Sequence, residues 1–101
     1  MSTPARTATT VRIEHAVSDY PAWKQIFDSD PLDRRGSGVQ RYRVHRSMDT
    51  PNHVFIDLDF AEIDAAREMV TKLADLWSGS AARLIVNPRA VILECVESGE
   101  A

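Results

Sequence analysis

Two runs of alternating apolar and polar side chains, joined by a short turn, constrain the fold of this chain more than any other feature. The runs span residues 39–48 and 53–60, and the turn residues 49–52 are DTPN. Alternation places apolar side chains on one face of a strand and polar ones on the other, while Asp, Pro and Asn favour tight turns. The segment is therefore predicted to be a β-hairpin with one apolar and one polar face.

Two other segments have the spacing of amphipathic helices. The first opens at Asp19, whose side chain can cap a free backbone N–H, with Pro21 in the first turn, and it ends before Pro31. The second is predicted over residues 62–77, with Asp59 or a residue just after it as its cap. The apolar faces are Tyr20, Trp23, Ile26 and Phe27 in the first helix, and Ile63, Ala66, Val70, Leu73 and Trp77 in the second.

Alternation also predicts one strand near each end of the chain, over residues 11–16 and 89–96. Asn87-Pro88, just before the last strand, is predicted to be a turn. Residues 1–10 are small and polar, without periodicity, and are predicted to be a disordered tail.

The resulting element order, β-α-β-β-α-β, defines the fold class. It is the order of a ferredoxin-like α+β domain, in which two helices pack on one face of a four-stranded antiparallel sheet. The chain has 101 residues, which leaves room for one domain, placed at residues 11–98. Because the helices cover one face only, the other face of the sheet is open.

The hairpin residues are assigned to these two faces by their polarity. A shift of one residue in the register would exchange the two sets. The core set is Tyr42, Val44, Met48, Val54, Ile56, Leu58 and Phe60, and the open set is Arg41, Arg43, His45, Phe55, Asp57 and Asp59. The sequence leaves open which side chains the two outer segments add to the open face. The first strand adds either His15 with Val11 and Ile13, or Arg12 with Glu14. The last strand adds either Ile92 and Val96, or Leu93 and Cys95.

Composition narrows the possible functions. A net charge of -3 argues against nucleic acid as a partner, because polyanion binders carry a clustered basic surface. No apolar run approaches the roughly 20 residues that a membrane-spanning helix needs, and the N-terminus lacks the apolar centre of a secretion signal, so a cytoplasmic location is expected. The three histidines and single cysteine lack metal-ligand spacing, and no phosphate-binding glycine loop occurs, so neither metal nor cofactor is expected.

His45 is the strongest candidate for catalysis, because imidazole transfers protons near neutral pH. It is expected beside Arg43 and across the hairpin from Asp57, whose carboxylate would orient its ring. Arg43 would then stabilise an oxyanion of the ligand. The alternative is an ordinary solvated sheet face, on which these charges form cross-strand ion pairs.

Other side chains are candidates for ligand binding. Arg41 can make forked hydrogen bonds to a carboxylate or enolate. His15 either packs against the first helix or enters a pocket, whereas His53, at the hairpin turn, is expected to be exposed. The aromatic candidates are Phe55, Trp23 and Trp77, although helical spacing of aromatic residues is also typical of a core.

Four strings of this sequence resemble a known family. DYPAWKQIFD, GVQRYRVHR, HVFIDLDF and PRAVILECVE have the order and spacing found in small bacterial proteins of the dimeric α+β barrel superfamily, near the antibiotic biosynthesis monooxygenase-like and "cyclase"-labelled proteins. The resemblance covers about residues 11–97. It implies a homodimer whose open sheet faces meet, with a pocket between sheet and helices. It does not imply one chemistry, since this superfamily includes cofactor-free oxygenases, haem-degrading enzymes, isomerases and polyketide cyclases.

These observations lead to a functional prediction with two alternatives. The first is a homodimer that binds a hydrophobic, aromatic or polyketide-like small molecule and, as an enzyme, uses His45 with Arg43 for cofactor-independent oxygenation, cyclisation or isomerisation. The second is a non-catalytic ligand-binding or regulatory dimer, in which the Arg and Asp side chains satisfy one another. Both alternatives remain open at the level of sequence.

Overall fold

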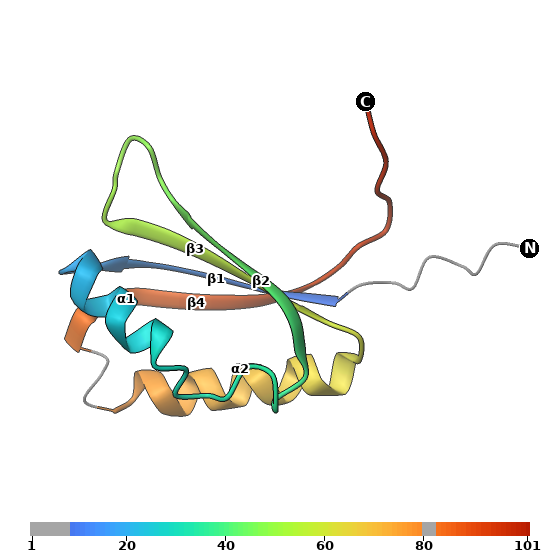
Figure 1. Ribbon diagram of the computed structural model, residues 1–101, viewed down its shortest axis with the longest axis horizontal. Helices are drawn as coiled ribbons and strands as arrows, with labels where there is room; N and C mark the ends of the chain where they lie inside the picture. The colour runs from blue at the N-terminus through green and yellow to red at the C-terminus, as the bar shows by residue number, and fades with distance from the viewer. Residues whose placement is uncertain (1–8, 80–82) are drawn as a thin grey trace, which may run out of the picture.

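The computed structural model describes residues 9–79 and 83–101. Its elements are β1 (Thr9–Val17), α1 (Tyr20–Asp28), β2 (Val39–Arg46), β3 (His53–Phe60), α2 (Ile63–Trp77) and β4 (Ile85–Glu94). The strands pair antiparallel in the order β2-β3-β1-β4. Both helices lie on one side of this sheet (Figure 1). The predicted ferredoxin-like α+β fold is confirmed.

The strand boundaries differ from the predictions near both ends of the chain. β1 begins at Thr9, inside the segment predicted to be a tail; residues 1–8 of that segment lie outside the described residues. β4 begins at Ile85 and runs through Asn87, where a turn was predicted. Asn87 has a φ of 52°, and the pairing of β4 with β1 shifts register opposite this point. The turn-forming residues therefore make a β-bulge within the strand instead of reversing the chain.

Helix α1 begins as its sequence predicts. The Asp19 side chain accepts a hydrogen bond from the Ala22 backbone N–H at 3.1 Å, and Pro21 lies in the first turn. The Trp23 ring lies 5.7 Å from the Tyr20 ring and 5.4 Å from the Phe27 ring, measured between centroids. Because Trp23 is also buried, this row of rings attaches α1 to the sheet.

The core fills the space between the sheet and the helices. All apolar side chains that the alternation of β3 assigns to the core are buried. Burial also decides the orientation of β1, whose odd-numbered side chains point to the core and whose even-numbered ones reach the open face. The largest fully buried side chains are Phe60, Met69, Val11 and Val54.

Some assignments to the core and to the helix cap are wrong. Met48 lies in the hairpin turn and is 96% exposed, because the strand ends at Arg46. Tyr42 is 49% exposed, because β2 is an edge strand of the sheet. In α2, Ile63 is 47% exposed, since it occupies the first turn at the edge of the sheet, and Met69 is buried in the core instead. The N-cap residue of α2 is Glu62, which makes no side-chain capping bond. Of the helices in the described ranges, none has the length and apolarity required to cross a membrane.

Candidate ligand-binding site

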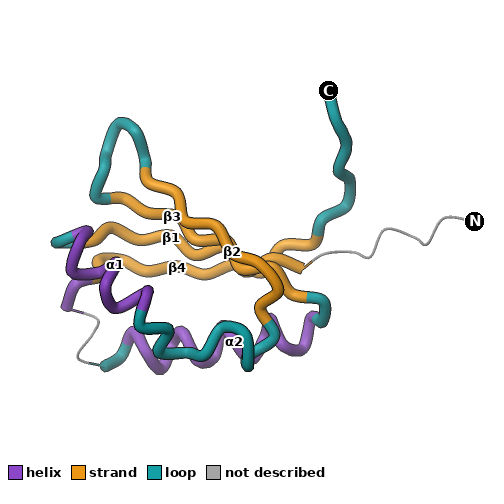
Figure 2. Tube along the Cα trace, in the orientation of Figure 1, coloured by secondary structure: helices purple, strands orange, loops and turns teal. Residues whose placement is uncertain are grey.

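A cavity of about 80 Å³ lies between the sheet and both helices. Its floor is formed by β1, β3 and the first residue of β4, and its walls by α1, α2 and the loop of residues 29–38. Figure 2 shows this loop running from α1 along α2 before it enters β2. The lining is mainly apolar and includes Ile13, Trp23, Phe27, Leu58, Leu73 and Trp77.

His15 is the one histidine that lines this cavity in the described part of the chain. The residue is 2% exposed, and its ring meets the Trp23 ring edge-on at 5.6 Å between centroids. Burial lowers the pKa of the His15 imidazole below its ordinary value, so the ring is neutral near pH 7. Nδ1 lies 3.2 Å from the Ala16 carbonyl oxygen, which assigns the proton to Nδ1 and leaves Nε2 as an acceptor.

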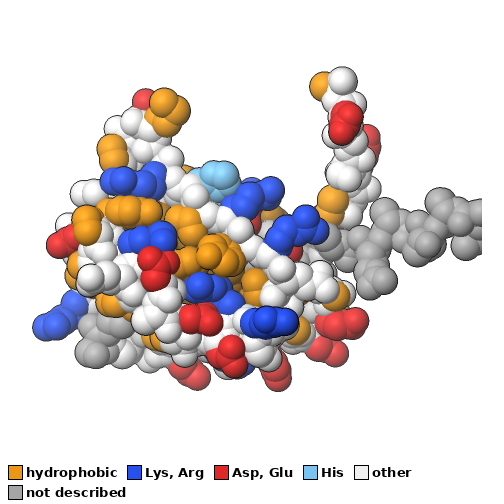
Figure 3. Space-filling model, viewed as in Figure 1, with side chains coloured by type: hydrophobic (Ala, Val, Ile, Leu, Met, Phe, Trp, Pro, Cys, Tyr) orange, Lys and Arg blue, Asp and Glu red, His pale blue; other side chains and the backbone are white. Residues whose placement is uncertain are grey.

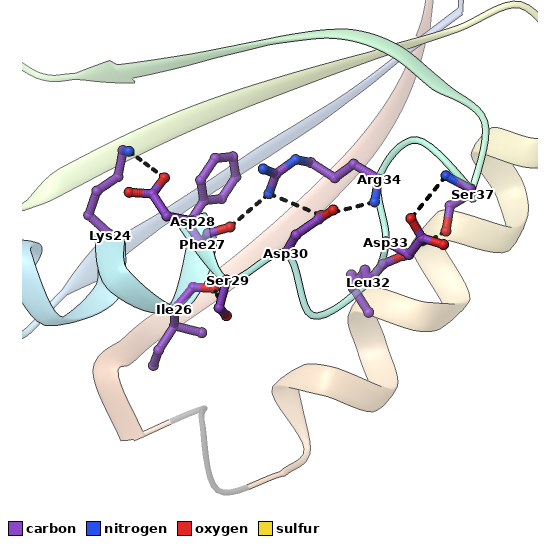
Figure 4. A network of polar contacts seen from close by, with 11 residues as sticks. Lys24, Ile26, Phe27, Asp28, Ser29, Asp30, Leu32, Asp33, Arg34 and Ser37 are labelled. Atoms are coloured by element: carbon purple, nitrogen blue, oxygen red, sulfur yellow. Dashed lines mark hydrogen bonds and ion pairs between the residues drawn. The ribbon is translucent and has the colours of Figure 1, made fainter.

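Arg34 holds the loop that forms one wall of the cavity. Its guanidinium carbon lies 4.1 Å from the centre of the Phe27 ring and 4.7 Å from that of Tyr42. Its Nη1 donates to the Phe27 carbonyl oxygen at 2.8 Å and lies 3.5 Å from the Asp30 carboxylate (Figure 4). Arg34 was not predicted from the sequence, because residues 29–38 form no helix, and a spacing of four residues from Asp30 predicts an ion pair only on a helix.

The predicted catalytic residues lie on the opposite, open face of the sheet. Asp57 is buried there, and its carboxylate accepts two hydrogen bonds from Arg12, from Nε at 2.9 Å and from Nη2 at 3.0 Å. Arg43 approaches the same carboxylate at 3.6 Å. The hydrogen bonds from Arg12, assisted by the charge of Arg43, hold the pKa of the Asp57 carboxyl below its ordinary value despite burial.

The contact that the sequence predicts between His45 and Asp57 does not form. Arg43 pairs with Asp57 in the register of β2 and β3, and His45 pairs with Phe55. The reason is the hairpin turn, which determines the pairs of residues that face each other. His45 lies two positions closer to this turn than Arg43, the residue that faces Asp57. His45 is exposed, and none of the three predicted catalytic residues lines the cavity.

A second carboxylate of the open face, Asp59, has two partners. The Thr10 hydroxyl donates to Asp59 Oδ1 at 2.7 Å, and Arg41 Nε lies 3.9 Å from Oδ2. The Asp59 carboxylate therefore bonds to side chains of neighbouring strands and does not cap α2. Arg41, a predicted ligand-binding residue, remains largely exposed beside it.

A third carboxylate, Glu14, lies near the bulge. Its Oε2 is 3.0 Å from His53 Nε2, and its Oε1 is 3.5 Å from Arg89 Nη2. The prediction that His53 is simply exposed is wrong, since its side chain is 32% exposed and its ring lies 5.0 Å from the Phe55 ring, measured between centroids. Both orientations that the sequence left open are now decided, because Arg12, Glu14 and Leu93 all face the open side.

The two faces of the sheet thus have different chemical characters. The open face carries carboxylates paired with arginine or histidine, whereas the helix side has a mainly apolar cavity lined by one neutral imidazole. Figure 3 shows exposed hydrophobic side chains beside α1, bordered by basic and acidic ones. In the described residues no group of three or more His, Cys, Asp or Glu side chains could hold a metal ion.

Comparison with solved structures relates this architecture to known proteins. SnoaB from Streptomyces nogalater, described as a cofactor-independent oxygenase, matches with a TM-score of 0.70 at 17% identity, covering 91% of this chain and 96% of its own. A candidate antibiotic biosynthesis monooxygenase from Bordetella bronchiseptica matches with a TM-score of 0.66 at 18% identity, over 90% and 99% of the two chains. The fold is the one that the sequence resemblance implies.

A third similar structure is a dimeric ferredoxin-like protein from an uncultured marine organism, with a TM-score of 0.63 at 8% identity over 94% of this chain and 93% of its own. No protein-family model matches the sequence, and no curated protein matches it. At these identities the likeness establishes the fold, and the site must be argued from its own geometry.

Proposed function

We propose that this chain forms a homodimer that binds a hydrophobic, aromatic small molecule in the cavity between sheet and helices, and that its reaction is cofactor-independent oxygenation. The observation that carries the proposal is the apolar cavity with His15 in its wall. Apolar cavities stay dry and take apolar ligands, and ligand sites typically combine such walls with a few polar groups. SnoaB, which shares the fold, is described as a cofactor-independent oxygenase.

The cavity carries this proposal better than the open face does. Asp57 already has Arg12 and Arg43 as partners, which leaves it little capacity to serve a ligand. Catalysis by His45, Arg43 and Asp57 stays a prediction. His15, in contrast, combines burial, a neutral ring and contact with the cavity.

Ligand binding is tested with toluene and 1-naphthol, titrated calorimetrically into the purified protein. We expect saturable binding of at least one of them, and an affinity at least about tenfold weaker in Leu76→Trp, because the larger side chain fills the cavity that Leu76 lines. Thr71→Trp, on the exposed side of the same helix, is the matched control and should bind as the unchanged protein does. Absence of saturable binding by toluene, by 1-naphthol and by the single-ring hydroxyl compound phenol, or equal affinity in Leu76→Trp, contradicts the proposal.

Oxygen uptake distinguishes the enzyme from the non-catalytic alternative. With 1-naphthol as ligand and no added cofactor, the oxygenase is expected to convert the ligand and one O2 into naphthoquinone and one water, so that the ligand supplies all the electrons. Oxygen uptake in an electrode cell should then be proportional to protein concentration. A binding protein of the same fold leaves the oxygen concentration unchanged.

The homodimer is proposed from the open face. Asp57, Asp59 and Glu14 are each paired within one chain, so a second sheet could cover these carboxylates without leaving one of them unpaired. We expect sedimentation at twice the chain mass, and a dimer at least about tenfold weaker in Leu93→Glu, because a new carboxylate would be buried at the interface. Met48→Glu, in the exposed hairpin turn, should leave the dimer intact. A monomer at micromolar concentration would rule out the dimer.

A further inference from the structure

The size and the polar chemistry of the cavity specify its ligand further. We propose that it takes a compound with a single aromatic ring bearing a hydroxyl, and that this hydroxyl donates a hydrogen bond to Nε2 of His15. The inference rests on the proposed function, because it names the ligand class of the same site. It excludes the fused-ring, polyketide-like ligands that the sequence left open.

The first argument is volume. The cavity measures about 80 Å³. An engineered apolar cavity of about 150 Å³, lined by Leu, Ile and Phe, binds benzene. The space is therefore suited to one ring after slight adjustment of its walls. The second ring of a fused compound requires one wall to move away or else lies in the opening of the cavity to solvent, where it gains fewer contacts.

The second argument is that the wall without regular secondary structure, the loop of residues 29–38, is held in place by side-chain contacts. The loop of residues 29–38 is tied to α1 by Arg34, through the Phe27 carbonyl oxygen and ring (Figure 4). Within the loop, the Ser37 hydroxyl donates to the Leu32 carbonyl oxygen at 2.7 Å, and Lys72 Nζ of α2 donates to the Ser37 hydroxyl at 2.8 Å. These bonds join the loop to both helices, so enlarging the cavity on this side breaks several contacts at once.

The third argument concerns the polar groups that line the cavity and the hydrogen bonds that they already make. Of the charged groups there, Arg34 and Asp30 form an ion pair, Asp30 also accepts from the Arg34 backbone N–H, and Arg34 donates to the Phe27 carbonyl of α1. His15 uses Nδ1 for the Ala16 carbonyl, and within the described residues no protein group bonds its Nε2. Nε2 is thus an acceptor in an apolar space, which matches a hydroxyl donor and disfavours a group that can only accept.

The test compares three ligands on the unchanged protein by calorimetric titration: phenol, toluene and 1-naphthol. Phenol and toluene have nearly the same shape and differ in the hydroxyl, while 1-naphthol keeps the hydroxyl and adds a ring. We expect phenol to bind about tenfold more tightly than toluene and more tightly than 1-naphthol.

The variant His15→Phe tests whether Nε2 of His15 accepts the hydrogen bond from the ligand hydroxyl. His15→Phe keeps an aromatic ring in the wall and removes Nε2, so it should lose the preference for phenol over toluene while still binding toluene. His53→Phe, on the open face, is the matched control and should retain the preference. Because the ligand pair is first compared on the unchanged protein, the proposal stays testable even if His15→Phe does not fold.

The outcomes separate this inference from the proposed function. Toluene binding as tightly as phenol overturns the assignment of the hydroxyl to His15. Tighter binding of 1-naphthol than of phenol overturns the limit to one ring. Either result leaves the cavity as a ligand site, whereas no saturable binding by any of the three compounds overturns both proposals.

Discussion

Trp23→Ala is expected to lower the free energy of unfolding by about 3–5 kcal/mol, the largest effect of any substitution considered. Trp23 is 5% exposed, and its ring packs against those of His15, Tyr20 and Phe27. Truncation removes this row of contacts and leaves a void continuous with the existing cavity. The loop of residues 29–38, which is bonded to both helices, prevents this void from collapsing. Urea unfolding followed by far-ultraviolet circular dichroism measures the change.

Two controls make this result specific. Trp77→Ala truncates the other tryptophan of the cavity wall, which is only half-buried, and should cost clearly less than Trp23→Ala. Trp23→Phe keeps a ring between α1 and the sheet and should recover much of the loss. A decrease below about 1 kcal/mol for Trp23→Ala, the size of an average substitution, would show that α1 does not pack on the sheet through this ring.

Asp57→Asn is expected to have the second largest effect and to change the pH dependence of stability. Near neutral pH it should cost about 1.5–3 kcal/mol, because Arg12 loses charge-assisted hydrogen bonds in a nearly buried site. The pKa of the Asp57 carboxyl is held below its ordinary 3.8, so the unfolded chain takes up this proton more readily than the folded one. The contribution is therefore complete above that value and is lost as the pH falls through the lower, folded pKa.

Chemical denaturation at pH values from 7 down to about 3, at one fixed protein concentration, measures this effect. The difference in unfolding free energy between the unchanged protein and Asp57→Asn should be constant in the neutral range and shrink below about pH 4. Asp75→Asn, on the exposed surface of α2, is the matched control and should follow the unchanged protein. A difference that does not vary with pH would contradict the stabilised carboxylate.

The sequence predicted those features that depend on local patterns. The cap at Asp19, the hairpin and the buried face of β3 follow from residues close together in the chain, and the structure confirms them. The same hairpin shows the limit of this reasoning. Polarity placed His45, Arg43 and Asp57 on one face, but the exact register, which depends on the length of the turn, pairs Asp57 with Arg43 and leaves His45 beside Phe55.

The sequence by itself therefore determined the order of the elements, the fold class and the side of the sheet on which each hairpin residue lies, because alternation, helical spacing and turn residues act locally. Only the tertiary structure decided the site. His15 faces the cavity, and Arg12 reaches Asp57, because β1 is inserted between β3 and β4. The register of the bulge at Asn87 against β1 and the volume of the cavity likewise arise from contacts between segments far apart in the chain, which no local pattern encodes.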